Sequence, residues 1–356
     1  MLPIAGKEAE RWILAQLLSG DATMKIGFIG LGNVGAKLAG SLVRNGQDVT
    51  VRDINPAAAQ PLLELGAKWA DSGKELAIAS DIVITCLPSP RVSSQVMEEK
   101  NGVLEGLSSG KIWLEMSTTD EEEVKRLGAR VEASGAIPLD SPVSGGCHRA
   151  VTGNIAIFAG GSREAFERVL PLLTVMGRKV IHTGPLGSAS VLKVITNYLA
   201  GVQLISTGEA FMVARKSGID LGTAYEAIRV SSGNSFVHET EGQLILNGSY
   251  NINFTMDHEV KDLTLFDQLG KTLDIPLELS PLCVEIMQDG LKRYGPRAWS
   301  SMVVKRLEDD CNETLRSPGF PACLVDHEPE EPGYEVRRNP EPAPLSGPNP
   351  QEPGQR

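Results

Sequence analysis

The first half of the chain alternates short apolar runs with stretches of helical periodicity. From Met24 to about residue 182, β-branched and aliphatic residues form short clusters that are separated by amphipathic segments. This alternation predicts a largely parallel sheet with helices on both faces. The expected strands are 25–29, 48–52, 81–86, 111–115, 136–139, 155–159 and 179–182. The expected helices are 35–44, 56–65, 91–99, 120–133 and 163–176.

The pattern changes after residue 187. Residues 188–218 contain no proline, and apolar side chains recur at helical spacing, as at Val191, Val194 and Tyr198. We therefore predict one long helix there. Further helices are expected at 221–230, 239–246, 257–270, 281–290 and 299–309. The plan is an α/β domain joined by a long helix to an all-α domain.

Two end segments lie outside these patterns. Residues 1–23, with one short amphipathic stretch at 8–18, are interpreted as an N-terminal extension. Residues 317–356 hold ten of the 22 prolines and seven acidic against three basic residues, so they bury too little apolar surface to offset the entropy of ordering. A proline-rich recognition peptide is the alternative interpretation of this tail. The predicted division is 1–23 extension, 24–186 α/β domain, 187–315 helical domain and 316–356 disordered tail rich in Pro and Glu.

Composition restricts the classes of function. The 356 residues carry a formal net charge of -11, which disfavours a nucleic-acid binder that works by neutralising phosphates. The apolar runs are shorter than the roughly 20 residues of a membrane-spanning helix, so no membrane association is expected. The five cysteines are scattered without a CxxC pair, which indicates neither a disulfide framework nor a metal site. Since the N-terminus does not resemble a signal peptide, we expect a cytoplasmic protein.

A glycine-rich loop, GLGNVG, follows the first expected strand and opens the first helix. In this pattern Gly30 permits a tight turn, Gly32 lets the backbone approach a pyrophosphate, and Gly35 lets helix and strand pack closely. Asn33 and Val34 complete the loop, and the helix dipole behind them favours phosphate. The motif alone is weak, but its position between a strand and a helix indicates a Rossmann-type, doubly wound domain that binds a dinucleotide.

Residues at later strand ends extend this cofactor site. Asp53 follows the second strand, where a carboxylate binds the ribose hydroxyls and repels a 2′-phosphate, so NAD is favoured over NADP. The alternatives are that Asp53 only starts a turn, and that Arg52 faces the ribose and permits some use of NADP. Leu87, Pro88 and Thr118 follow later strands, at the edge where ligands lie in open α/β sheets.

Two further motifs carry polar groups. DSPVSGG offers the Ser144 hydroxyl and the backbone of Gly145 and Gly146 to a carboxylate, although a tight loop without function fits equally well. Lys193 and Asn197 lie four residues apart, on one otherwise apolar face of the long helix. Burial there would lower the lysine pKa toward that of a general acid or base. The alternative is a lysine whose ammonium reaches solvent.

In this order, the motifs resemble those of the β-hydroxyacid dehydrogenase family over about residues 24–310. The resemblance implies that Lys193 is the catalytic lysine and that Lys261, from a family Lys-Asp pair, approaches the nicotinamide. It implies a substrate site made of Ser144, Gly145, Gly146 and Asn197. Helical domains of this family pair, so a homodimer or homotetramer is expected.

This sequence departs from the family at a few positions. Where relatives commonly have small residues after Gly146, it has His148 and Arg149, which either shape the substrate pocket or cap the loop in solvent. Asn154 replaces a common threonine, which affects a strand start more than the chemistry. Lys193 argues against the imine reductases and the non-catalytic chromatin readers that resemble this family, because both usually lack the lysine.

The hypothesis is therefore NAD-dependent oxidation of a small β-hydroxy acid, such as 3-hydroxyisobutyrate, a 3-hydroxy amino acid or a sugar acid, to the semialdehyde or keto acid. Lys193 would take the hydroxyl proton as hydride leaves the carbinol carbon. One alternative is an NAD(P)H-dependent reductase of glyoxylate, succinic semialdehyde or tartronate semialdehyde. The other is a cofactor-binding protein without turnover, against which Lys193 and Asn197 argue.

Overall fold

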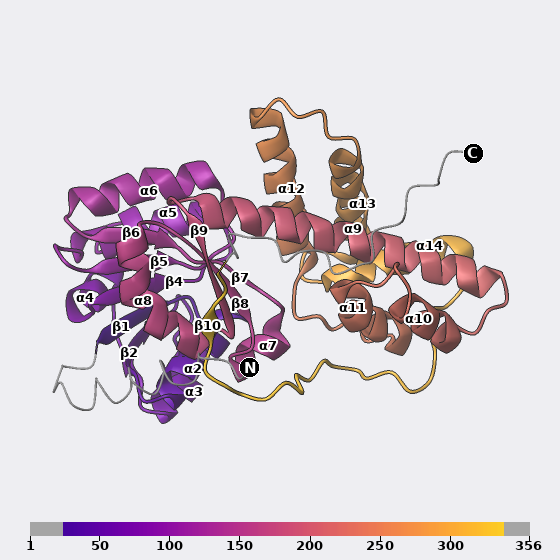
Figure 1. Ribbon diagram of the computed structural model, residues 1–356, viewed down its shortest axis with the longest axis horizontal. Coiled ribbons are helices and arrows are strands. Elements are labelled where there is room, and N and C mark those ends of the chain that lie inside the picture. Colours follow the sequence, from indigo (N-terminus) through magenta and orange to yellow (C-terminus); the bar gives the residue numbers. More distant parts are fainter. Residues whose placement is uncertain (1–23, 338–356) are drawn as a thin grey trace, which may run out of the picture.

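The computed structural model describes residues 24–337, which form two domains joined by one long helix (Figure 1). The first domain contains the sheet and its covering helices, and the second contains helices. Both the α/β and the all-α character predicted from the sequence are confirmed. The expected helix at 8–18 and the last part of the expected tail, 338–356, lie outside the described residues.

A ten-stranded sheet forms the centre of the first domain. The strands are β1 (Lys25–Ile29), β2 (Asp48–Arg52), β3 (Lys68–Trp69), β4 (Ile82–Thr85), β5 (Ile112–Glu115), β6 (Ile137–Asp140), β7 (Val143–Ser144), β8 (Ala156–Gly160), β9 (Lys179–Gly184) and β10 (Tyr334–Glu335). Their order is β10-β9-β8-β6-β5-β4-β1-β2-β3, and β7 pairs with β8 off this path. Pairing is parallel except between β8 and its neighbours β6 and β7.

Helices cover both faces of this sheet because successive strand side chains point to opposite faces. In β1, Ile26 and Phe28 belong to one apolar cluster and Ile29 to another. The first cluster includes residues of α2 (Gly35–Arg44) and α8 (Arg163–Met176), together with Leu62 of α3 (Gln60–Glu64). The second includes residues of α4 (Gly73–Ala79), α5 (Pro90–Glu98) and α6 (Glu121–Ala133).

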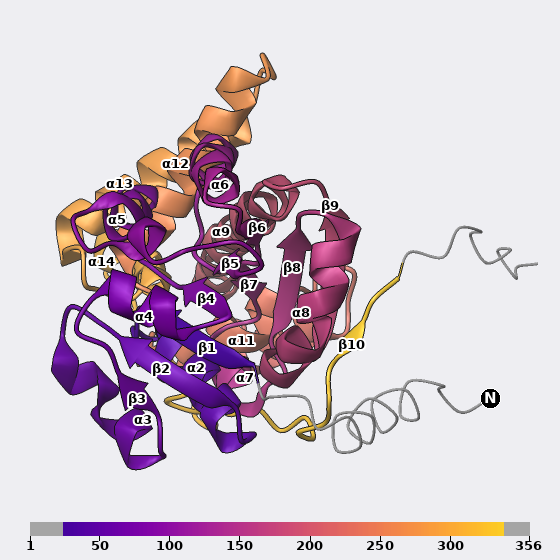
Figure 2. The ribbon, with the colours of Figure 1, turned by 90° about the vertical axis from the view of Figure 1, so that its left-hand side faces the viewer.

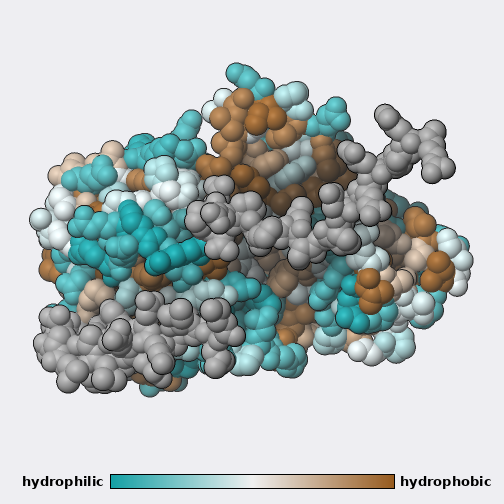
Figure 3. All heavy atoms as spheres, in the orientation of Figure 1, coloured by the Kyte–Doolittle hydropathy of each residue, from teal (hydrophilic) through white to brown (hydrophobic). Residues whose placement is uncertain are grey.

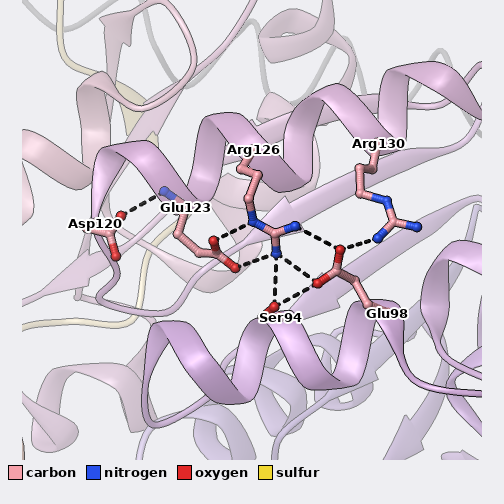
Figure 4. A network of polar contacts seen from close by, with 6 residues as sticks. All are labelled: Ser94, Glu98, Asp120, Glu123, Arg126 and Arg130. Carbon is pink, nitrogen blue, oxygen red and sulfur yellow. Dashed lines mark hydrogen bonds and ion pairs between the residues drawn. The ribbon is translucent and has the colours of Figure 1, made fainter.

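Charged side chains connect α5 to α6 on the outside of the second face (Figure 4). Arg126 of α6 donates to Glu98 of α5 at 2.8 Å, to Ser94 at 2.9 Å and to Glu123 at 2.7 Å, while Arg130 also contacts Glu98. The Arg126 guanidinium lowers the pKa of Glu98 to about 2. A single exposed ion pair contributes little to the free energy of unfolding, but this shared network orients α6 and the loop that precedes it.

The helix α9 (Ser188–Lys216) runs from the sheet domain into the helical domain (Figure 1). Its 29 residues span about 44 Å at the usual rise per residue. The helices beyond it are α10 (Leu221–Arg229), α11 (Phe236–Asn247), α12 (Met256–Thr272), α13 (Leu279–Tyr294) and α14 (Lys305–Cys311). Leu204 and Phe211 of α9 share an apolar core with Ile245, Leu263 and Met287 from these helices.

By length and composition alone, α9 is the one helix in residues 24–337 that could cross a membrane, although the apolar runs of the sequence predicted no such helix. In the structure its middle packs against α11 and α12, and Lys193 is buried on it. The helix thus packs against its neighbours over part of its surface, and 33% of its most apolar stretch is buried.

Residues 317–337, which we name the strap, differ from the disordered tail predicted for 316–356. The strap leaves the helical domain, runs along the outside of the molecule and adds β10 beside β9 (Figures 1 and 2). Ion pairs of Glu335 with Arg163 and of Glu331 with Arg178 attach it to the sheet domain. The sequence prediction was wrong here because acidic residues that look solvent-directed in isolation have basic partners more than 150 residues away.

Candidate active site

The glycine-rich loop lies at the point where the strand order of the sheet switches. From β1 the chain continues to β2 and β3 and then returns to β4 on the other side of β1. In open α/β sheets, ligands bind in the crevice at the carboxyl ends of the strands where the order switches in this way. Gly30 has φ +98°, and a Cβ there would lie 2.2 Å from the Cys86 carbonyl oxygen. A Cβ on Gly35 would lie 2.0 Å from the Gly30 oxygen, whereas nothing lies within 4 Å of the Cβ position at Gly32. The loop is therefore tightly packed at Gly30 and Gly35 and has free space at Gly32, where a pyrophosphate could approach the backbone.

Other predicted cofactor residues surround this loop. Val34 is the residue before α2, and the Asn33 amide donates to the Asn253 carbonyl of the helical domain at 3.1 Å. Leu87 follows β4, and its backbone N–H donates to a serine hydroxyl beyond β5 at 2.7 Å. Pro88 continues the same loop. These contacts bring the ends of β1, β4 and β5 together at the edge of the second domain.

Asp53 holds the glycine-rich loop directly. Its carboxylate accepts the Leu31 N–H at 2.6 Å and the Asn55 N–H at 2.8 Å. Arg52 instead donates to the carbonyls of Ala70 and Asp71, at 3.3 and 2.5 Å. Thus the carboxylate lies beside the loop, and the guanidinium is bonded to the segment after β3.

Asp140 connects the DSPVSGG motif to the start of α9. This buried carboxylate accepts the Gly187 N–H at 2.9 Å, and the Ser190 N–H and hydroxyl at 2.7 and 2.9 Å. Burial raises the pKa of Asp140, and these hydrogen bonds oppose that shift. Sequence reasoning missed this link. The one local signal was that Gly187, the residue before α9, offers no capping side chain.

The predicted carboxylate loop lies between β7 and a short helix that the sequence did not predict, α7 (Cys147–Thr152). Ser144 is half-buried, and Gly145 and Gly146 have φ of +129° and +86°. A Cβ on Gly146 would lie 3.0 Å from the His148 ring, and one on Gly145 would lie 3.4 Å from Cδ of Arg149. The two unusual side chains of α7 therefore pack back onto this loop.

A chain of polar contacts links Lys193 to the cofactor side of the cleft. Lys193, only 8% exposed, donates from Nζ to the Asn197 Oδ1 at 2.7 Å. The Asn197 amide donates in turn to the Asp262 carboxylate. Lys261 pairs with Asp262 at 2.7 Å and donates to the Thr118 carbonyl at 2.7 Å. Asp262 is a second residue that sequence reasoning left without a role.

Burial lowers the pKa of Lys193 from 10.5 to about 8. The Asp262 carboxylate opposes this shift, the Lys261 ammonium adds to it, and Glu259 opposes it. A substantial fraction of the amine is therefore neutral near pH 8. This buried position differs from that of a lysine whose ammonium reaches solvent. It gives an amine able to take up and return a proton.

Two family models match the chain: the NAD binding domain of 6-phosphogluconate dehydrogenase over residues 25–184, and the NAD-binding domain of NADP-dependent 3-hydroxyisobutyrate dehydrogenase over residues 187–307. The chain is 32% identical over 286 residues to 2-(hydroxymethyl)glutarate dehydrogenase of Eubacterium barkeri, and the matched region covers 80% of this chain and 95% of the relative. It is 31% identical over 292 residues to 2-hydroxy-3-oxopropionate reductase of Escherichia coli, and the matched region covers 82% of this chain and 100% of the relative.

A crystal structure of 3-hydroxyisobutyrate dehydrogenase from Salmonella typhimurium superposes with a TM-score of 0.73 at 30% identity, covering 80% of this chain and 99% of that one. The fold and the cleft thus define an NAD(P)-dependent oxidoreductase of hydroxy acids. More specifically, the chain belongs to the β-hydroxyacid dehydrogenase family, as its motifs predicted. The matched family regions end at residue 307, before the strap begins.

Proposed function

We propose that the protein uses NAD to oxidise a small β-hydroxy acid, similar to 3-hydroxyisobutyrate, a 3-hydroxy amino acid or a sugar acid, to the semialdehyde or keto acid. The observation that carries this proposal is the buried Lys193 amine, whose pKa is lowered to about 8 and whose Nζ is held by Asn197. A proton acceptor near neutral pH is what removal of an alcohol proton requires.

In this proposal each residue of the site has a separate role in binding or proton transfer. The Ser144 hydroxyl and the backbone of Gly145 and Gly146 bind the substrate carboxylate. Neutral Lys193 accepts the proton of the substrate hydroxyl, while Asn197 holds Nζ in place. Bound NAD would supply the hydride acceptor. In the reverse direction the Lys193 ammonium returns the proton and stabilises the developing alkoxide.

NAD is preferred over NADP in this proposal because of the groups at the end of β2. The Asp53 carboxylate lies at the loop where the ribose would bind, and it would repel a 2′-phosphate. Arg52 donates from Nη1 to two carbonyls of the segment after β3, which holds this part of its guanidinium at that segment. The family itself includes enzymes of both cofactor types.

The second candidate is an NAD(P)H-dependent reductase of glyoxylate, succinic semialdehyde or tartronate semialdehyde. The E. coli relative, whose name describes a reductase, favours it. The same Lys193 would then act as a proton donor. Cofactor preference and the substrate that turns over distinguish the two directions.

We further propose a homodimer or homotetramer in the cytoplasm. Apolar surface gathers over α12 and α13 in Figure 3, where four large side chains are 45 to 58% exposed: Leu273, Ile275, Leu279 and Leu282. An exposed apolar patch of this kind is typical of a protein interface, and a second copy is the partner proposed here. The free state of all five cysteines agrees with a reducing compartment.

The decisive experiment is a screen of NAD and NADP reduction over 3-hydroxyisobutyrate, serine, threonate, tartrate and 3-phenylserine, with the reverse assay on the three aldehydes above. On the best substrate, Lys193→Ala should lower kcat by roughly 100-fold or more and leave NAD binding intact. Lys292→Ala, which removes an exposed lysine of α13, is the matched control. Undiminished turnover by Lys193→Ala would exclude this lysine from the mechanism.

A further inference from the structure

The strap contacts both domains. At the helical domain, the Ser317 N–H donates to the Leu246 carbonyl at 3.0 Å, and the Phe320 ring lies edge-on to Tyr225 with centroids 4.9 Å apart. At the other end, β10 pairs with β9 at the edge of the sheet. Between these two attachments the strap passes α7, the helix that directly follows the predicted carboxylate loop.

Two acidic residues of the strap bind at α7. Asp326 accepts the Asn154 amide at 2.7 Å and the Thr152 hydroxyl at 2.5 Å. The same Asn154 amide, which is buried, donates to the backbone carbonyl of Glu328 at 3.1 Å. The Glu328 carboxylate pairs with Arg149 at 2.5 Å. The strap therefore contacts the middle of α7 at Arg149, its last residue at Thr152, and Asn154 just beyond it.

Arg149 connects the strap to the helical domain as well. Its guanidinium carbon lies 5.0 Å from the ring centroid of Phe236, the first residue of α11. The His148 ring stacks on the same phenylalanine, with centroids 6.5 Å apart and planes 14° apart. The two side chains that pack on Gly145 and Gly146 therefore also lie against Phe236, which stays 47% exposed. A guanidinium over an aromatic face is attractive, and its orientation depends on what else the guanidinium binds.

We propose that Arg149, oriented by Glu328 of the strap, is a positioning residue that fixes the Ser144-Gly145-Gly146 loop against α11 across the cleft between the domains. This inference rests on the proposed function, in which that loop binds the substrate carboxylate. Pairing of β7 with β8 holds Ser144, but Gly145 and Gly146 adopt positive φ and carry no side chain that could hold them. The strap lies outside the matched family regions, which end at residue 307.

Loss of the Arg149–Glu328 ion pair should affect substrate binding more than the stability of the fold. The Glu328 side chain is 53% exposed, and an ion pair so exposed adds little to folding. If the loop is loose, the substrate carboxylate must order it on binding, and the free energy of binding becomes less favourable by that ordering. Turnover of the bound complex changes little, because the loop is already ordered there. Loss of the pair should therefore raise KM and leave kcat nearly unchanged.

The chain offers a closely matched control. Glu331 of the same strap pairs with Arg178, the residue before β9. The Glu331 side chain is 54% exposed, against 53% for Glu328, and the two arginines are 24% and 27% exposed. Glu331→Gln therefore removes an equivalent ion pair from the strap without touching α7.

The experiment compares Glu328→Gln, Glu328→Asp and Glu331→Gln in the full chain. We expect Glu328→Gln to raise KM for the hydroxy acid roughly tenfold with kcat within about twofold, Glu331→Gln to change neither, and Glu328→Asp, which keeps a carboxylate for Arg149, to raise KM much less than Glu328→Gln does. Equal effects of the two glutamine variants, or equal effects of Glu328→Asp and Glu328→Gln, would overturn the proposal.

Hydrogen exchange provides a readout that needs no substrate. Glu328→Gln should speed amide exchange in residues 144–152, while Glu331→Gln should not. If no hydroxy acid turns over but this difference is found, the proposed function fails and the positioning contact stands. If turnover is found but exchange and KM are the same in both variants, the positioning role fails alone.

Discussion

At the scale of single residues, Lys193 shows how the surroundings of a side chain determine its chemistry. Burial removes solvent from the ammonium and favours the neutral amine, and the Asp262 carboxylate, reached through Asn197, moderates the effect. The pKa of about 8 is the result of these two causes together with the smaller effects of Lys261, which lowers it, and Glu259, which raises it. Sequence spacing could predict that Lys193 and Asn197 share a helix face. It could not predict Asp262, which lies 65 residues beyond Asn197 in sequence.

Asp262→Asn should move the pH dependence of oxidation to lower pH. The base works as the neutral amine, so kcat/KM rises as pH increases through the Lys193 pKa. Because the Asp262 charge raises that pKa, removing the charge lowers it, and the inflection should fall below about 8. The measurement is the pH profile of kcat/KM, with Asp267→Asn on the same helix as the control. An inflection that stays in place or rises would contradict this account.

Asp53→Asn should shift cofactor preference toward NADP. The amide oxygen can still accept the Leu31 N–H, but the negative charge that repels a 2′-phosphate is lost. We expect the ratio of kcat/KM for NAD over NADP to fall by roughly tenfold. Arg52→Ala should leave the ratio close to that of the wild type, because Arg52 binds two backbone carbonyls. A larger effect from Arg52→Ala than from Asp53→Asn would reverse the assignment.

At the scale of elements, periodicity in the sequence predicted the long strands and helices well. The helices α2 and α8 have the predicted bounds, and the predicted seven strands are present with ends shifted by at most two residues. The elements that were missed are short: β3, β7, β10, α4 and α7. Such elements gain little from their own sequence and are stabilised by partners elsewhere in the chain, as α7 is by the strap. The glycine-rich loop was predictable because it depends on glycines at fixed positions within one short segment of the sequence.

The start of α9 offers a test of such a distant partner. Asp140→Ala removes three hydrogen bonds to the first turn of α9 and leaves buried donors without acceptors. We expect a loss of about 2 to 3 kcal/mol in the free energy of unfolding, measured with urea. Asp120→Ala, which removes a local cap of α6 with one hydrogen bond, should cost about 1 kcal/mol. Equal losses would show that Asp140 is an ordinary cap.

At the scale of the whole molecule, the apolar patch of α12 and α13 lies in the second domain, away from the sheet (Figures 1 and 3). Leu279 and Leu282 of α13 are 45% and 50% exposed. A monomer would keep these side chains in water, at a cost of about 25 cal/mol for each Å² of apolar area. In the proposed homo-oligomer, the surface of a second copy would remove that cost.

Leu282→Glu should therefore weaken self-association. A charge placed within an apolar interface loses its hydration and has no partner there. Light scattering after size-exclusion chromatography should show a smaller average mass for this variant at low protein concentration. Val213→Glu on α9, which alters a side chain 66% exposed, is the control for added charge. The same mass for wild type and Leu282→Glu would place the interface elsewhere.

The path of the strap also affects how the two domains can move. A domain attached to its neighbour at one point can swing in any direction, but attachment at two points leaves rotation about the line between them as the main freedom. Here the chain passes between the domains at the start of α9 and again along the strap (Figure 1). We therefore expect the domains to open mainly by rotation about the line between these two attachments, and to return to the same alignment when they close.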